Sequence, residues 1–167
     1  TGIELALPLD GSTLHSRIWL AEVVGLGGHT VPVYFLDTRH EGNAPEHAAL
    51  GNRLYGGDDS VRLRQEYLLG VGGIRALNAL GHGPLTGLHM NEGHCSFLTL
   101  ALLKKFKGNE DKVRSKCHFT THTPVEAGHD RFAVDRCRKL LHGPLPEDLK
   151  LPSWVQSSRL HMTELGL

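Results

Sequence analysis

The sequence predicts an α/β fold in which a β meander precedes a βαβ unit. Three observations support this class. Strand-like apolar stretches fill residues 1–37, a helical pattern runs over 58–80, and strand and helix patterns alternate over 85–141. Such alternation is typical of parallel strands that are joined by a helix. A polar loop, residues 38–57, separates the β-rich part from the βαβ part, residues 58–167.

The β-rich part contains three predicted strands. Ile3–Leu9 alternates in polarity, Leu14–Val24 is rich in Leu, Ile, Val and Trp, and Thr30–Leu36 has the composition of a buried strand. Turn-forming residues lie between them, at Pro8, Asp10 and Gly11 and again at Gly25, Gly27 and Gly28. We therefore expect an antiparallel meander, or a hairpin with a neighbouring strand. In the polar loop that follows, we expect a short helical turn near Pro45–Leu50.

A long helix is predicted over Asp58–Leu80, with Asp58 or Asp59 as its N-cap. Its apolar stripe consists of Leu63, Tyr67, Val71, Ile74 and Leu77. Glycine disfavours a helix by about 1 kcal/mol relative to alanine. The cluster Gly70, Gly72 and Gly73 therefore indicates that the helix packs closely against a sheet. Arg62, Arg64 and Glu66 are interpreted as a charged helix face with local pairing.

The predicted βαβ unit consists of a strand over Leu85–His89, a helix over Asn91–Phe106 and a strand over Val113–Thr120. A second helix is predicted over Arg131–Leu141. An incomplete parallel sheet leaves open edges, so we expect poor solubility or self-association of the chain by itself.

Composition excludes several classes of protein. The chain has 167 residues, 18 basic and 18 acidic, and no clustered basic face that would favour nucleic acid or an anionic membrane. No apolar run approaches the ~20 residues that a membrane span needs. Three unpaired cysteines, Cys95, Cys117 and Cys137, fit a cytoplasmic protein. Neither end resembles a natural domain boundary, so we expect an internal piece of a longer protein.

Two polar clusters follow predicted strands and are the candidate functional residues. One runs from His89 to His94 and the other from Thr120 to Pro124. Because ligands bind at the carboxyl ends of parallel strands, we expect one pocket at a shared edge of the sheet. Carboxylate, amide and imidazole groups together offer the donors and acceptors that sugar hydroxyls need.

Other readings of these clusters remain open. His89, Glu92, His94 and His122 are zinc-ligand types, as in a metal-dependent hydrolase, although the i, i+4 histidine pair of HExxH is missing. The histidines could instead cap strand ends without any ligand. A non-catalytic carbohydrate-binding module is the third reading, but Trp19 and Trp154, the available stacking platforms, lie far from the clusters in sequence.

Six stretches resemble the α-glucan phosphorylases, most closely the bacterial and archaeal type. They are YFLDT at 34–38, RLYGGD at 53–58, RLRQE at 62–66, LGVGGIRAL at 69–77, HMNEGH at 89–94 and FTTHTPVEAGHDRF at 119–132. Their order and spacing agree with the family across residues 30–132. The tail from His161 resembles the start of the family's next helix. Two departures are Glu126, where proline is expected, and Cys95, where a smaller residue is expected.

The resemblance implies a GT-B glycosyltransferase fold with two Rossmann-like lobes, of which this chain would be an internal piece of the first. The family cleaves α-1,4-glucan with inorganic phosphate and releases glucose 1-phosphate with retention. It uses pyridoxal phosphate, bound through a lysine of the second lobe, so no cofactor-binding and no metal-binding residue is expected here. His122 matches the catalytic histidine whose carbonyl faces the anomeric carbon. Asn91, Glu92, His94 and Thr123 match substrate-binding positions, and the 37–52 loop would lie near the mouth of the site. By itself, the chain is expected to be inactive.

Overall fold

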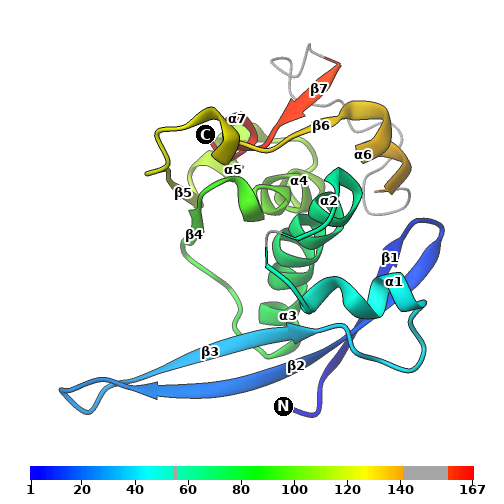
Figure 1. Cartoon of the computed structure of the whole chain (residues 1–167). Helices are drawn as coiled ribbons and strands as arrows, with labels where there is room; N and C mark the ends of the chain where they lie inside the picture. The colour runs from blue at the N-terminus through cyan, green and yellow to red at the C-terminus, as the bar shows by residue number, and fades with distance from the viewer. Residues whose placement is uncertain (55, 141–157) are drawn as a thin grey trace.

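The computed structural model describes residues 1–54, 56–140 and 158–167, and within them it confirms the α/β class. A long β meander lies along one side of the molecule, a central helix crosses it, and a pair of short parallel strands lies beyond the helix (Figure 1). No helix of this described part is long and apolar enough to span a membrane.

The meander consists of β1 (Glu4–Leu9), β2 (Ser12–Val24) and β3 (Thr30–Asp37), paired antiparallel in that order. Asp10 and Gly11 both adopt positive φ in the tight turn between β1 and β2. β1 and the first half of β2 bury their leucines in the core. The far half of β2 and most of β3 extend away from it (Figure 1). The interpretation of Thr30–Leu36 as a buried strand is therefore wrong, because no residue of β3 is fully buried and only Tyr34 and Leu36 of this strand pack against the core.

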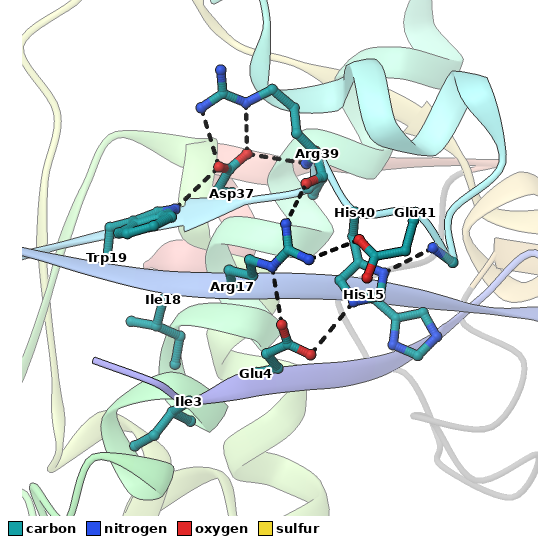
Figure 2. A network of polar contacts seen from close by, with 12 residues as sticks. Ile3, Glu4, His15, Arg17, Ile18, Trp19, Asp37, Arg39, His40 and Glu41 are labelled. Carbon is teal, nitrogen blue, oxygen red and sulfur yellow. Dashed lines mark hydrogen bonds and ion pairs between the residues drawn. The ribbon is translucent and has the colours of Figure 1, made fainter.

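The loop after β3 contains the predicted helical turn, as α1 (Pro45–Ala48) followed by the 3₁₀ turn η1 (Ala49–Gly51). A polar network fixes the start of this loop on the meander (Figure 2). Arg17 on β2 reaches Glu4 at 3.0 Å, Glu41 at 2.7 Å and the carbonyl of Arg39 at 3.1 Å. Trp19 donates its indole N–H to Asp37, whose pKa the Arg39 guanidinium lowers to about 2.

The predicted long helix comprises α2 (Asp59–Tyr67), the π-helical turn η2 (Leu68–Gly72) and α3 (Gly73–Ala79). Asp58 is the N-cap, as predicted, and accepts hydrogen bonds from the amides of Ser60 and Val61. Tyr67 donates its hydroxyl to the carbonyl of Pro8, which holds the helix against the meander. The π turn was not predicted.

Close packing at the glycine cluster is confirmed, but its partners differ from the prediction. A Cβ at Gly70 would lie 2.9 Å from backbone atoms of Cys95 and Leu98, which belong to the βαβ part rather than to a sheet. Gly72 does face the meander, since its Cβ would lie 3.1 Å from Leu7. Gly73 has no neighbour within 4 Å.

The βαβ unit is present, with shifted bounds. β4 (Leu88–Asn91) leads through the 3₁₀ turn η3 (Gly93–Cys95) to α4 (Phe97–Lys105) and α5 (Glu110–Arg114), and β5 (Cys117–Thr120) then pairs parallel with β4. The predicted strands Leu85–His89 and Val113–Thr120 both began too early. Val113 belongs to α5, an element that was not predicted.

The C-terminal segment differs most from the prediction. After the 3₁₀ turn η4 (Glu126–Gly128), the chain forms β6 (Arg131–Ala133) and α6 (Val134–Leu140). The helix predicted over Arg131–Leu141 is thus wrong at its start, and Leu141 lies outside the described residues. β6 pairs antiparallel with β7 (Arg159–His161), which leads into α7 (Met162–Gly166), where the tail was expected to turn helical.

Candidate functional site

The two predicted polar clusters meet at the carboxyl ends of β4 and β5. Asn91 pairs with Thr120 in the parallel register. The amide of Glu92 then donates to the carbonyl of Thr120 at 2.8 Å, so the two chains remain adjacent one residue beyond the strands. The expectation that both clusters lie at one edge of the sheet is therefore correct.

Glu92 is the centre of this junction. It adopts a left-handed backbone conformation, with φ 61°, and only 3% of it is exposed. Its Oε1 accepts hydrogen bonds from the amides of His122 at 2.8 Å and Thr123 at 3.0 Å and from the Thr123 hydroxyl at 2.9 Å. Its Oε2 accepts from the Thr121 hydroxyl at 3.0 Å. The His122 amide, with help from the threonines, lowers the pKa of Glu92 to about 2, although burial opposes this shift.

These bonds fix the direction of two backbone carbonyls. In a planar trans peptide, the C=O points opposite to the N–H of the next residue. Because the Thr123 amide points at Glu92, the carbonyl of His122 points away from it. By the same reasoning, the His122 amide turns the Thr121 carbonyl away from the buried carboxylate. The turn therefore presents two fixed carbonyl dipoles on the side opposite Glu92.

The His122 ring lies over the same junction and is largely exposed. Its Nδ1 is 3.2 Å from Glu92 Oε1, and its Nε2 is 3.2 Å from Asn91 Oδ1. Both ring nitrogens therefore face oxygen atoms from the end of β4. Nearby, His89 Nε2 contacts the Thr120 hydroxyl at 2.7 Å. The structure thus brings together four of the five predicted site residues: Asn91, Glu92, His122 and Thr123.

The fifth predicted residue, His94, is grouped with other partners. It lies in η3, half-buried, with a ring nitrogen within 4.8 Å of carboxylate oxygens of Glu66 and Asp130. Burial is the main cause that lowers the pKa of His94. It also lines a cavity of about 400 Å³ together with Arg62 and Glu66 of α2 and apolar residues of β3 and η1.

This second cluster was not predicted from the sequence. Arg62 and Glu66 do pair, at 3.3 Å, but Glu66 is only 2% exposed, so its interpretation as part of a charged surface face is wrong. Burial, followed by the neighbouring Asp130, raises the pKa of Glu66 to about 10. Asp130 is placed by the segment before β6, whose position depends on pairing with β7. No local pattern in the sequence reveals that contact.

The metal reading of the sequence predicted a different set of ligands. Within the described residues, one group of three or more ligand-type side chains has donor atoms within 4.8 Å of one another. It consists of Glu66, His94 and Asp130. Of the predicted ligands, only His94 belongs to it. Glu92 instead directs both of its oxygens to the 121–123 turn. The structure therefore does not assemble the predicted zinc hydrolase centre.

Comparison with known proteins supports the resemblance. The chain is 37% identical to a glycogen phosphorylase of Mycobacterium tuberculosis, over an alignment of 152 positions that covers 84% of the chain. It is 34% identical to the maltodextrin phosphorylase of Thermococcus litoralis, over an alignment of 165 positions that covers 92% of the chain. The chain is a homologue of the α-glucan phosphorylases. A glycogen phosphorylase of Aquifex aeolicus is 41% identical over an alignment of 107 positions that covers 60% of the chain.

The homology covers a limited part of these phosphorylases. The chain spans 17% of the length of the Mycobacterium tuberculosis protein and 20% of that of the Thermococcus litoralis protein. No protein-family model matches the chain. The alignment with the maltodextrin phosphorylase covers 92% of the chain and includes both strand-end clusters and the residues between them.

Proposed function

We propose that this chain supplies part of the glucosyl-binding wall of an α-glucan phosphorylase. That enzyme would cleave α-1,4-glucan with inorganic phosphate and release glucose 1-phosphate with retention of configuration. The observation that carries the proposal is the junction of Glu92 with the 121–123 turn, which fixes the backbone at the carboxyl end of β5. The phosphorylase homologues at 34–41% identity give the reaction class.

In this proposal, Glu92 is a positioning residue and does not contact the sugar. Its carboxylate oxygens already accept four hydrogen bonds from the turn. The carbonyl of His122, held outward, would face the anomeric carbon, where positive charge develops as the glycosidic bond breaks. A fixed dipole of this kind stabilises the transition state because it needs no reorganisation. Asn91 and the His122 ring would bind glucosyl hydroxyls.

The proposal places this chain in the first lobe of a GT-B fold, with residues 1–37, 38–57 and 58–167 as the β-rich part, the loop and the βαβ part. Pyridoxal phosphate would supply a proton relay through its phosphate in the whole enzyme. The described residues at the Glu92 junction offer a carboxylate, an amide, hydroxyls and imidazoles, but no amine for a Schiff base. These residues therefore do not fit the cofactor, and their part is limited to holding and polarising the sugar.

A chimera tests this proposal. The chain would replace the matching segment of the Thermococcus litoralis maltodextrin phosphorylase, and release of glucose 1-phosphate from maltodextrin and phosphate would be measured. We expect the chimera to be active. Glu92→Gln should lower kcat by about tenfold or more with little change in KM, because the turn loses its anchor. Glu126→Gln, at an exposed position, should leave both constants unchanged. A chimera that folds but is inactive, or in which Glu92→Gln keeps full kcat, would disprove the proposal.

A further inference from the structure

The cluster of Glu66, His94 and Asp130 consists of side chains other than the proposed sugar contacts and has a geometry of its own. Three different segments contribute to it: α2, η3 and the residues just before β6. One donor atom from each side chain lies within 4.8 Å of the other two. Atoms at that spacing can approach one central ion with small side-chain movements, because zinc takes nitrogen and oxygen donors at about 2.0–2.2 Å.

Arg62 satisfies only part of this cluster. Its guanidinium pairs with Glu66 Oε1 at 3.3 Å and with Asp130 Oδ2. The second oxygen of Glu66, Oε2, is buried and has no hydrogen-bond partner. Buried polar atoms are almost always satisfied, so this oxygen, in a side chain that is 2% exposed, needs a partner, which is either a proton shared with Asp130 or a bound cation.

We propose that Glu66, His94 and Asp130 bind one divalent transition-metal ion, such as Zn²⁺ or Co²⁺. One imidazole nitrogen and two carboxylates form a donor set that suits these ions better than Mg²⁺ or Ca²⁺, which prefer oxygen alone. Burial raises the pKa of Glu66 to about 10, so this carboxyl holds a proton in the metal-free chain, and a bound divalent ion would displace that proton. The cavity of about 400 Å³ lined by Arg62, Glu66 and His94 gives the ion a route from solvent.

The site does not depend on the proposed phosphorylase reaction. It would connect the central helix to the start of the C-terminal segment, because Glu66 belongs to α2 and Asp130 precedes β6. A bound ion would therefore stabilise the contact between these two parts of the fold. This role can be measured on the 167-residue chain without any assay of activity.

The experiment is a titration of the chelator-treated chain with Co²⁺, followed by the visible absorption of the bound ion and by the thermal midpoint. We expect one Co²⁺ per chain and a raised midpoint. Glu66→Gln, His94→Gln and Asp130→Asn should each weaken binding by about tenfold or more. The matched control is Asp10→Asn, because Asp10 is also a carboxylate beside an arginine and a histidine, Arg64 at 2.6 Å and His47 at 3.7 Å. This control should bind Co²⁺ like the unmodified chain.

Two results would overturn the proposal. If the unmodified chain binds no stoichiometric Co²⁺, the occupant of Glu66 Oε2 is a proton shared with Asp130. If binding survives all three substitutions, the ion is held elsewhere, for example by some of the other histidines among the 12 in the sequence. Should a variant fail to fold, as judged by circular dichroism, the titration of the unmodified chain still decides between these outcomes.

Discussion

Single residues carry much of the candidate site, and Glu92 is the clearest case. Its folded pKa of about 2 lies below the ordinary value of 4.5, so its ionised form is favoured by folding. That contribution to the free energy of unfolding is fully present above about pH 4.5 and is lost as the pH falls towards 2. We predict that Glu92→Gln lowers stability at neutral pH by about 1–3 kcal/mol, the usual range for hydrogen bonds to a charged group.

Urea unfolding between pH 2.5 and 7 would check this prediction. The difference between the unmodified chain and the Gln variant should shrink as the pH falls. Glu126→Gln is the control, because Glu126 pairs with Arg131 at the surface and its side chain is 77% exposed. A difference at position 92 that is constant with pH would show that charge does not hold the turn.

At this scale, the sequence predicts what is local. The N-cap Asp58 bonds to amides two and three residues later, so composition is enough to find it. The hydrogen-bond partners of Glu92 lie 29–31 residues further along the chain. The positive φ of Glu92, which directs its side chain towards them, cannot be predicted from the local sequence Asn-Glu-Gly-His. The meeting of the two clusters was therefore predictable, but the hydrogen bonding of the Glu92 carboxylate to the 121–123 turn was not.

The central helix shows how elements depend on close backbone approach. Gly70→Ala places a methyl group 2.9 Å from the carbonyl oxygen of Cys95, just before α4, and 2.9 Å from the amide nitrogen of Leu98, in its first turn. Because both are backbone atoms, they cannot rotate away. We predict a loss of about 1–3 kcal/mol or more in the free energy of unfolding. Gly73→Ala is the matched change, three residues along the same helix, with helical dihedrals and open space around the added Cβ. It should stabilise by about 0.4–1 kcal/mol.

Thermal and urea unfolding of both variants gives the test, and the opposite signs make it stringent. If both substitutions stabilise the chain, the close contact at Gly70 is absent in solution. If both destabilise it, the helix near Gly73 is packed against a neighbour that the described residues do not provide.

The errors of sequence prediction at the element scale share one cause. Residues 131–133 have helical composition but form β6, because they pair with Arg159–His161, whose residues lie 26, 28 and 30 positions further along the chain from their partners. The π turn at Leu68–Gly72 likewise places Gly70 against the turn before α4, a tertiary requirement that apolar periodicity does not encode. Strands and helices set by their own periodicity, such as β1, β2 and α2, were found with small errors at their ends.

For the whole molecule, the distribution of apolar surface is the main departure from an ordinary small domain. Register pairs in the outer half of the β2–β3 hairpin are Trp19 with Phe35, Ala21 with Val33, and Val23 with Val31. Alternate residues of a strand share a face, so these six side chains form one apolar face. Five of the six are exposed, and Val33 is half-buried. An apolar face of this kind on a hairpin that extends from the core favours association in water.

We predict that the chain by itself associates in a concentration-dependent manner through this face. The double substitution Val23→Lys with Val31→Lys should shift the chain towards monomer in sedimentation velocity, because both side chains are more than half exposed and the added charges repel an apolar partner. Glu22→Lys is the control, since it also changes the net charge by two but lies on the opposite face of β2, paired with Pro32. Association that persists in the double variant, or an unmodified chain that stays monomeric at the highest concentration reached, would rule out this face as the cause.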